Sequence, residues 1–510
     1  MADRSFLLSV AVLIAYLCLS HIIGLLILRT FISHPNSLVI SGSPLIGATA
    51  MGIELWIFGA IRIPWNALTL LLPWAVFAVI SRRHVLEIVR ADAAIVRSMR
   101  RSWGELDSLT SVLVVVGGAF MAIYLINVVS QPLMAFDGVS MWFFKAKHFF
   151  ALNAVDLRAI AGMDVYSPTT VWQLRQPALG ETAWPGSAAD LVRHPDYPPL
   201  FSLLVASLYT LVGRVQESVG QGISFLFLVV AAASSYALLR RLLDVRFAIA
   251  FTFLIVALPK VSLALTNSSS IGLADYALGA SMMLAIAHLI YGEVTGDASS
   301  YATGVIFASI AALIKNEGLV FLGIVVALVA VRGALSFREN RGQIWQRRPL
   351  VAAALALAPV VAWQIYIRGA GFRSDLIAHV DPAHVIAALP IRFLLIIVQL
   401  KNMHTFSFHN DYGWLVASFL LSSALLVLNR LRFGLLVYAV ISLQWIAYFV
   451  VYLFTPYPVI WHMATSLDRL VLGMASPMIL LLAISLSPYV GKTRDRTNQR
   501  LTLRTIPQHA

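Results

Sequence analysis

The stretch SLTSVLVVVGGAFMAIYLINVVS, residues 108–130, is apolar and long enough to cross a lipid bilayer as one helix. A bilayer core needs about 20 mostly apolar residues in a helical span. Similar runs recur along the chain, and they are continuous rather than alternating, which favours helices over a β-barrel. We therefore predict an all-α, polytopic transmembrane helical bundle of about 13 spans. The predicted spans are residues 6–28, 44–60, 66–80, 108–130, 221–239, 246–265, 272–291, 302–314, 318–331, 350–367, 414–428, 434–454 and 467–487.

The composition supports a membrane protein. Of the 510 residues, 59% are hydrophobic and only 12% are charged, whereas a soluble domain is nearer half apolar and a quarter charged. The net charge of +13 could suggest nucleic acid, but arginines that cluster between apolar segments are typical of cytoplasmic loops. We expect no nucleic-acid partner and a location in a bacterial cytoplasmic (inner) membrane.

The basic clusters also predict the orientation of the chain. Arginines and lysines gather around residues 82–101, 240–246, 332–348 and 430–432 and in the C-terminal tail. The positive-inside rule places these segments in the cytoplasm. The remaining connections then face outward, and they are residues 131–197, 266–271, 315–317, 368–413 and 455–466.

This map predicts three parts of the chain. Residues 1–107 would hold extra N-terminal transmembrane helices and a basic loop, residues 108–490 the main module, and residues 491–510 a basic tail. The apolar segment 198–212 cannot cross without moving a basic cluster outward, so we expect it to be half-inserted or to lie on the surface. The stretch 388–401 is interpreted in the same way.

The stretch FDGVSMWFFKAKHFF, residues 136–150, follows the span 108–130. Read as one helix, it carries an apolar stripe that includes Trp142, which predicts an interfacial helix with aromatic rings in lipid and Lys145 and Lys147 near lipid phosphates. An ordinary anchor would look the same. Asp137 is different, because an acid adds little to anchoring and an ionisable group at a membrane boundary is a functional candidate.

Four more segments bring polar residues to the outward side. The segment RHPDYPPLFSLL, 193–204, is a proline-rich, extended entry to an apolar helix. The segment TNSSSIGLADYALGAS, 266–281, begins another apolar helix, and the dipole of that helix alone could stabilise a carboxylate in its first turn. The segment AALIKNEGLVFLG, 311–323, predicts a helix break at Lys315 and Glu317. In the alternative interpretation it is a tight turn between helices whose charged side chains extend to water. TPYPVIWHMATSLDRLVLGMASP, 455–477, could be a capped helix start at 466–469 or an arginine that binds phosphate. The candidate residues in these segments are His194, Asp196, Tyr197, Asp275, Lys315, Glu317, His462 and Arg469.

The order of these segments resembles the C-type glycosyltransferases (GT-C), and within them the dolichyl-phosphate-mannose and aminoarabinose transferases of bacteria. The resemblance covers roughly residues 108–480 and implies transfer of a sugar from a polyprenyl-phosphate carrier to a lipid, glycan or protein acceptor of the cell envelope, at the outer face, with inversion. Asp137 matches the first-loop acid of that family. Many relatives carry an Asp-Glu pair there, whereas Gly138 follows Asp137. A divalent metal, Mg or Mn, is a candidate cofactor, but because the second acid of the pair is missing, no metal ligands are assigned.

These observations assign roles to the candidate residues. Asp137 would be the general base, because a carboxylate can take the proton of a sugar hydroxyl, while the phosphate leaving group needs positive charge rather than an acid. The expected donor phosphate-binding residues are Lys145, Lys147, Lys315 and Arg469. The expected substrate-binding residues are Trp142, His194, Asp196, Tyr197, Asp275, Glu317 and His462.

Two other functions compete with this one. A ligase or polymerase of lipid-linked glycans would depend on the histidine-rich loop 368–413, with His379, His404 or His409 in the leading role. A transporter of lipid-linked sugars would need a polar path through the bilayer, and the chain offers few charges in the middle of its spans.

Overall fold

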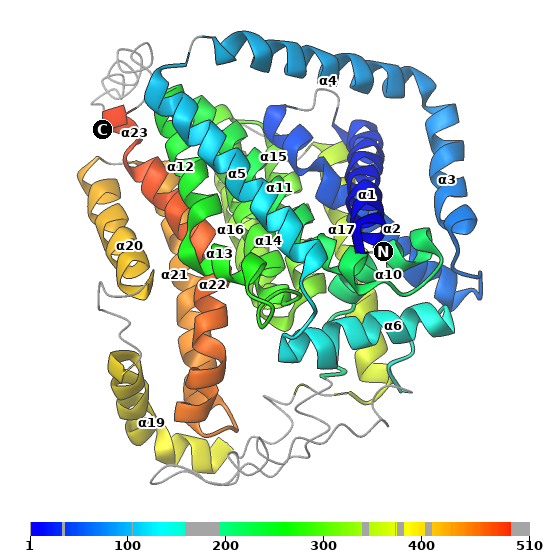
Figure 1. Ribbon diagram of the computed structural model, residues 1–510. Coiled ribbons are helices and arrows are strands. Elements are labelled where there is room, and N and C mark those ends of the chain that lie inside the picture. The colour runs from blue at the N-terminus through cyan, green and yellow to red at the C-terminus, as the bar shows by residue number, and fades with distance from the viewer. Residues whose placement is uncertain are drawn as a thin grey trace.

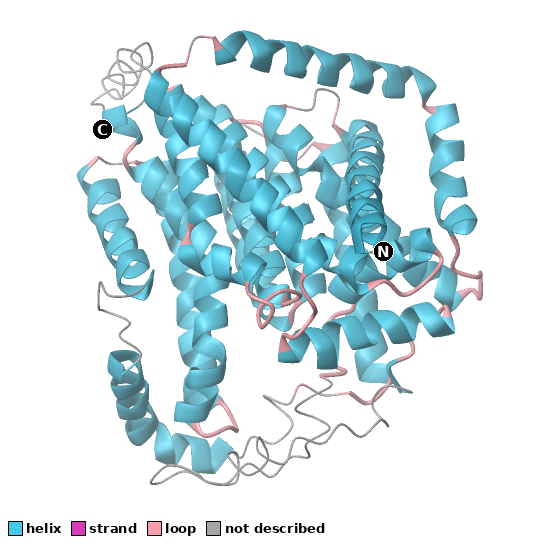
Figure 2. Ribbon diagram, in the orientation of Figure 1, coloured by secondary structure: helices cyan, strands magenta, loops and turns pink. Residues whose placement is uncertain are grey.

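The apolar runs of the sequence form helices in the computed structural model, and the part of the chain that it describes contains no strand (Figure 2). The described residues are 2–32, 36–104, 106–158, 194–338, 346–372, 374, 382–402, 411–429 and 431–490. In chain order the elements are α1 (Ala2–Phe31), α2 (Ser37–Ala60), α3 (Ala67–Ile80), α4 (Arg82–Trp103), α5 (Ser108–Ser130), the π-helical turn η1 (Gly138–Trp142), α6 (Phe143–Leu152), α10 (Leu200–Val212), α11 (Glu217–Leu242), α12 (Val245–Ala257), α13 (Pro259–Thr266), α14 (Ala274–Thr295), α15 (Ala298–Ile314), α16 (Asn316–Arg338), α17 (Arg347–Gly369), α19 (Pro382–Asn402), α20 (Asp411–Leu428), α21 (Arg432–Phe454), α22 (Val459–Ser485) and α23 (Ser487–Val490).

Several of these helices are long and apolar enough to cross a membrane, which confirms the multi-pass membrane class. Among the described residues nine helices meet that length and composition, or ten if the bent pair α3 and α4 counts as one span. Other expected spans are shorter helices. The run 246–265, for example, is split between α12 and α13 at Pro259, because proline removes a backbone donor and disfavours helix in the residue before it. The count of about 13 spans stays a prediction.

Helix α14 is the centre of the bundle, with nearly every residue buried. A helix that is apolar on all sides belongs in a core, and α14 packs against α11, α15 and α22. At the contact with α22 a Cβ on Gly279 would meet the carbonyl oxygen of Gly473 at 2.5 Å. Small residues allow such close backbone approach between membrane helices.

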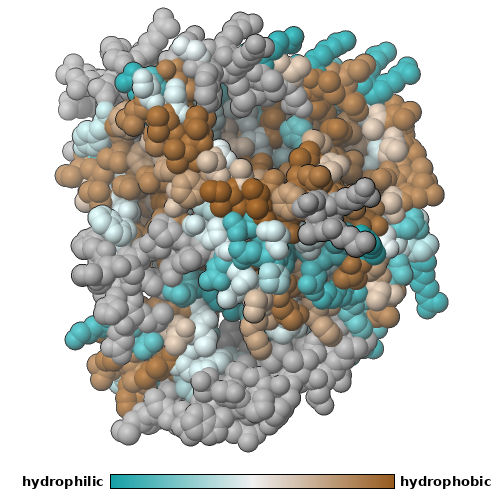
Figure 3. Space-filling model, in the orientation of Figure 1, coloured by the Kyte–Doolittle hydropathy of each residue, from teal (hydrophilic) through white to brown (hydrophobic). Residues whose placement is uncertain are grey.

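The two ends of the bundle are marked by helices that lie across it (Figure 1). Helix α4 meets α3 at a bend of 87° and runs along the end where the basic clusters lie, although the sequence predicted only a basic loop there. Helix α6 lies near the other end. Apolar side chains cover much of the visible outer face, while hydrophilic ones lie along the edge where α4 runs and in a patch near the middle of this face (Figure 3).

The N-terminal helices α1 and α2 are part of the same bundle. They pack against α10 and α11, and their apolar residues belong to the main hydrophobic core. The division at residue 107 stays a prediction.

Helix α10 excludes one of the two alternatives for 198–212, the surface-lying helix, and leaves the half-inserted one open. Residues 200–210 are all buried between α2, α6 and α11. Because every face of this segment is apolar, burial inside the protein exposes none of it to headgroups or water. The segment is 13 residues long, too short for a full span.

The expected lipid-facing stripe on residues 137–150 is also wrong. Trp142 and Phe143 are fully buried, and the hydroxyl of Ser202 on α10 donates to the Trp142 carbonyl oxygen at 2.8 Å. The segment is not one helix, because the π-helical turn η1 precedes α6 and shifts the side chains off the 3.6-residue period. Its rings therefore face the protein, and Lys145 is buried too.

The contact between α14 and α22 gives a stability prediction. Gly279→Ala places a methyl group against the Gly473 backbone and should lower the free energy of unfolding by about 1–3 kcal/mol. Gly323→Ala on α16 is the matched control, because no atom lies within 4 Å of its added Cβ. Equal unfolding midpoints for the two purified variants in detergent would contradict the predicted packing.

Candidate active site

Four segments far apart in the sequence bring charged side chains together at the α6 end of the bundle. Asp275 lies in the first turn of α14, whose N-terminal dipole favours a carboxylate. Lys315 is the extended residue between α15 and α16. Arg469 projects from within α22, and Asp137 directly precedes η1.

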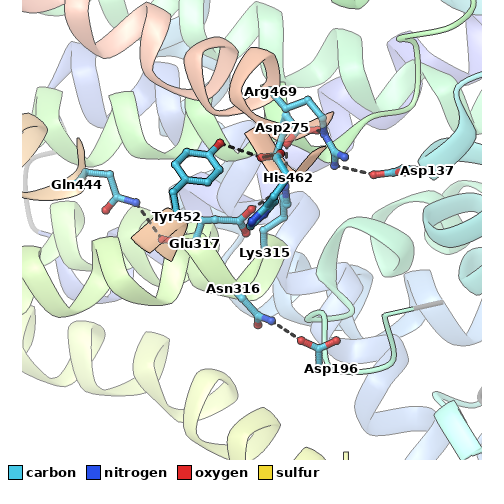
Figure 4. A network of polar contacts seen from close by, with 11 residues as sticks. Asp137, Asp196, Asp275, Lys315, Asn316, Glu317, Gln444, Tyr452, His462 and Arg469 are labelled. Atoms are coloured by element: carbon cyan, nitrogen blue, oxygen red, sulfur yellow. Dashed lines mark hydrogen bonds and ion pairs between the residues drawn. The ribbon is translucent and has the colours of Figure 1, made fainter. Parts of the chain in front are cut away.

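The side chains form a continuous chain of ion pairs (Figure 4). Arg469 joins two acids, with Nη2 2.6 Å from Asp137 Oδ2 and Nε 3.0 Å from Asp275 Oδ2. The Nζ of Lys315 lies 2.8 Å from Asp275 Oδ1 and 2.9 Å from Glu317 Oε1. Three carboxylates and two cations therefore alternate from Asp137 to Glu317, and we call these five residues the charge network.

The charge network has a buried centre and a more accessible rim. The side chains of Asp275 and Lys315 are 2% and 3% exposed, while those of Asp137, Arg469 and Glu317 are 17%, 26% and 22% exposed. Buried ions are costly unless they are paired, so Asp275 and Lys315 fix the geometry. Asp137, Arg469 and Glu317 are the members that a ligand can reach.

The break between α15 and α16 confirms the sequence prediction for 311–323, but not the alternative in which its charges snorkel to water. A Cβ on Gly318 would lie 2.1 Å from the Ala311 carbonyl oxygen, so the close return of the chain requires glycine. The return turns Lys315 and Glu317 toward each other, which two residues of one continuous helix cannot do. Lys315 stays inside the protein, while Glu317 lies on the rim of the charge network.

Aromatic rings form a wall beside the charge network. The Tyr197 ring stacks on Trp142 with centroids 5.8 Å apart and on His194 with centroids 4.6 Å apart. His194 has a left-handed backbone with φ of 39°, a conformation that residues other than glycine rarely adopt. Lys315 Nζ lies 5.7 Å from the Tyr197 ring centroid, so the wall adjoins the cation.

The segment before α10 is tied to the site by polar contacts. Asn316 donates to Asp196 Oδ2 at 2.7 Å (Figure 4), and Lys145 Nζ donates to the His194 carbonyl oxygen at 2.6 Å. Lys145 is fully buried. Burial lowers the pKa of Lys145 to about 7, against the opposing charge of Asp196. Lys145 therefore helps to position the aromatic wall through its hydrogen bond to the His194 backbone.

Helices α21 and α22 complete the other side of the site. Tyr452 and Ser466 share a hydrogen bond of 2.8 Å, and the His462 ring meets Tyr452 edge-on at 5.1 Å. Gln444 donates to the Glu317 carbonyl oxygen at 3.3 Å. Within the described part of the chain, Oε2 of Glu317 is buried and has no hydrogen-bond partner.

Most of the sequence candidates meet here, and one does not. Lys147 forms an ion pair with Glu217 at the start of α11, so we leave it out of the site. The alternative of a helix start at 466–469 is wrong, because α22 already begins at Val459. His379, His404 and His409 lie outside the described residues, as does most of the loop 131–197.

The sequence prediction missed three contributors: Asn316, Gln444 and Tyr452. Gln444 had a visible signal, since it is an amide within the apolar run 434–454. Tyr452 had none, because tyrosine is common at the ends of membrane helices.

The carboxylates do not gather as metal ligands. Among the residues that the structure describes, no group of three or more His, Cys, Asp or Glu side chains could hold a metal ion. Arg469 lies between Asp137 and Asp275, so a divalent cation would have to displace a guanidinium. The described residues therefore do not offer a ready set of ligands for Mg or Mn.

Comparisons of the chain with protein-family models, with curated proteins and with solved structures found no match.

Removing the central carboxylate should destabilise the fold. Asp275→Asn leaves Lys315 and Arg469 buried without their shared partner, and breaking such a pair costs about 3–5 kcal/mol. Arg246→Gln, which removes an exposed ion pair with Asp107, should not change the unfolding midpoint measurably. Similar midpoints for both variants in detergent would show that Asp275 does not organise the site.

Lys145 gives a pH prediction, since α6 lies outside the candidate spans. Its folded pKa of about 7 is below the ordinary value of 10.5, so between these values the unfolded chain binds more protons. Stability should therefore rise with pH across this window, by about 1.4 kcal/mol for each unit of pKa shift. Lys145→Met should flatten the rise in unfolding midpoint between pH 6 and 10, and an unchanged slope would contradict the assignment.

Proposed function

We propose that this protein is a membrane glycosyltransferase of the GT-C type. It would move a sugar from a polyprenyl-phosphate carrier to a lipid, glycan or protein acceptor at the outer face of the bacterial cytoplasmic membrane. The observation that carries the proposal is the charge network, in which an accessible acid, Asp137, shares the arginine Arg469 with a buried acid, Asp275. A bundle of about 13 spans, with residues 108–490 as the catalytic module, belongs to the same proposal.

The membrane setting supports an outward-facing site. Arg240, Arg241, Arg347 and Arg348 lie at the opposite helix ends from Asp275, and basic residues mark the cytoplasmic side. A site at a membrane boundary suits a substrate with a long lipid tail, because the tail stays in the bilayer while the sugar phosphate enters the protein. Among the described residues, α3 and α20 have large apolar side chains exposed around the bundle.

Arg469 is the proposed donor phosphate ligand. A guanidinium can bind two phosphate oxygens at once and stays charged at every working pH. Lys315 lies on the other side of Asp275 from Arg469 and supplies a second positive charge near the proposed phosphate site. As the sugar leaves, negative charge grows on the phosphate, and fixed cations stabilise this charge.

The pairing of Asp137 with Arg469 suggests how the base is released. An incoming phosphate competes with Asp137 for Nη2 of Arg469, which frees the carboxylate. Asp137 then accepts the proton of the acceptor hydroxyl while the hydroxyl oxygen forms a bond to the anomeric carbon. The bond from that carbon to the phosphate oxygen breaks, and its electron pair leaves with the phosphate. One displacement of this kind inverts the anomeric centre.

The sugar would lie between the aromatic wall and Glu317. The apolar face of a pyranose ring suits the aromatic surface of this wall, and Glu317, whose side chain is 22% exposed, can accept a hydrogen bond from a sugar hydroxyl. Tyr452 and His462 close the opposite side.

The activity test compares Asp137→Asn with Asp156→Asn, an acid in the same outward loop that is outside the charge network. Membranes containing each protein receive radiolabelled polyprenyl-phosphate sugars, and transfer of label to other lipids, glycans or proteins is measured. Asp137→Asn should reduce transfer by about 100-fold or more, the usual contribution of a general base. Asp156→Asn should keep the wild-type rate.

Full transfer by Asp137→Asn would remove Asp137 as the base while keeping the enzyme class. No transfer by the wild type from any of several donors would refute the proposed activity. Expression and unfolding midpoint should match between the two variants, because Asn is isosteric with Asp and Asp137 lies on the rim.

A further inference from the structure

A cavity of about 600 Å³ lies at the opposite end of the bundle from the charge network. It is formed where the end of α1, the start of α2, the ends of α11 and α14 and the starts of α15 and α17 meet. Asp275 and Tyr291 are 16 residues apart on α14, which is about 24 Å of helix. The cavity is therefore separate from the proposed active site.

Three arginines line this cavity: Arg241, Arg347 and Arg348. The guanidinium of Arg241 lies over the Tyr291 ring, 4.8 Å from its centroid, which holds the charge in place. Neither Arg347 nor Arg348 has an acidic partner among the residues that the structure describes. Arg332, on the neighbouring α16, differs because it pairs with Glu293 at 2.8 Å.

One acid lines the cavity, and it is already engaged. Both carboxylate oxygens of Asp297 accept hydrogen bonds at the start of α15, from the backbone and hydroxyl of Ser299 and the hydroxyl of Ser300. Asp297 therefore serves as a helix cap. The cavity keeps an excess of positive charge.

The start of α17 has no side-chain cap, which leaves the backbone N–H groups of Arg347 and Arg348 as candidate donors, while Pro349 has none. Its N-cap residue, Gln346, makes no side-chain hydrogen bond to the first turn, whereas Asn36 caps α2 by accepting from the amides of Leu38 and Val39. A helix start without a cap presents free N–H groups and a partial positive charge. Arg347 and Arg348 belong to this same turn, so side-chain and backbone donors converge.

We propose that this cavity binds a phosphate group on the cytoplasmic side of the membrane. Guanidinium forks and free backbone amides are the donors that phosphate oxygens accept best. Phe31, Ile32 and Pro349 give the cavity an apolar side, which suits the phosphate of an anionic membrane lipid. A soluble phosphate compound offers the same chemistry, and the inference does not depend on the proposed transferase activity.

The test measures binding to the purified full-length protein in a neutral detergent. Short-chain phosphatidylglycerol, short-chain phosphatidylcholine and inorganic phosphate are titrated separately and followed by native mass spectrometry or calorimetry. The variant Arg347→Gln/Arg348→Gln should weaken phosphatidylglycerol binding by about tenfold or more. The matched control, Arg82→Gln/Arg83→Gln, removes the same charge from exposed residues of α4 outside the cavity and should bind like the wild type.

The separate titrations also distinguish a lipid phosphate from a soluble phosphate. Loss of phosphatidylglycerol binding alone in the cavity variant identifies a lipid headgroup, and loss of inorganic phosphate binding identifies a soluble ligand. Equal weakening in both double variants would overturn the proposal, because general surface charge would then explain the binding. Unchanged binding in the cavity variant would overturn it as well. Arg241→Gln repeats the test at a second position if the double variant unfolds.

Discussion

The buried carboxylate of Asp275 is the constraint on which the site depends. It lies at the start of α14, a helix that is buried along nearly its whole length, and it holds both Lys315 and Arg469. A lone carboxylate there would be costly, and each of the two cations would be costly without it. The three charges therefore fix the relative position of α14, α22 and the α15–α16 break, and every other polar residue of the site is placed against these elements.

The irregular backbone at the site follows from the same constraint. Helix α15 ends at Ile314 and α16 begins at Asn316, so the chain turns at Lys315, whose side chain reaches Asp275 and Glu317 at once. Asp137 precedes a π-helical turn rather than an α-helix, and such turns often occur at functional sites. The irregular segments carry the accessible charges, while the regular helices behind them supply the apolar packing.

The sequence predicted the helical class and the gathering of the polar candidates at the end of the bundle opposite the basic clusters, because both follow from local patterns of apolar and basic residues. It could not predict how the outer segments pack. An apolar stripe such as Trp142 and Phe143 is suited equally to lipid and to another helix, and only the position of α10 decides between them. The partners in the charge network were also out of reach, since Asp137 and Arg469 are 332 residues apart in the sequence. The separation of Lys147 from the site had the same cause, because its partner Glu217 lies on another helix.

The two ends of the bundle hold their cations in different ways, and the difference bears on function. At the outer end each cation of the charge network is balanced by carboxylates, so a phosphate gains Arg469 only by displacing Asp137. Such competition would weaken binding and favour release, which suits the proposed turnover of a phosphate product. In the inner cavity Arg347 and Arg348 have no acid among the described residues to displace. A phosphate there would be held without competition, as expected for a ligand that stays bound while the outer site works.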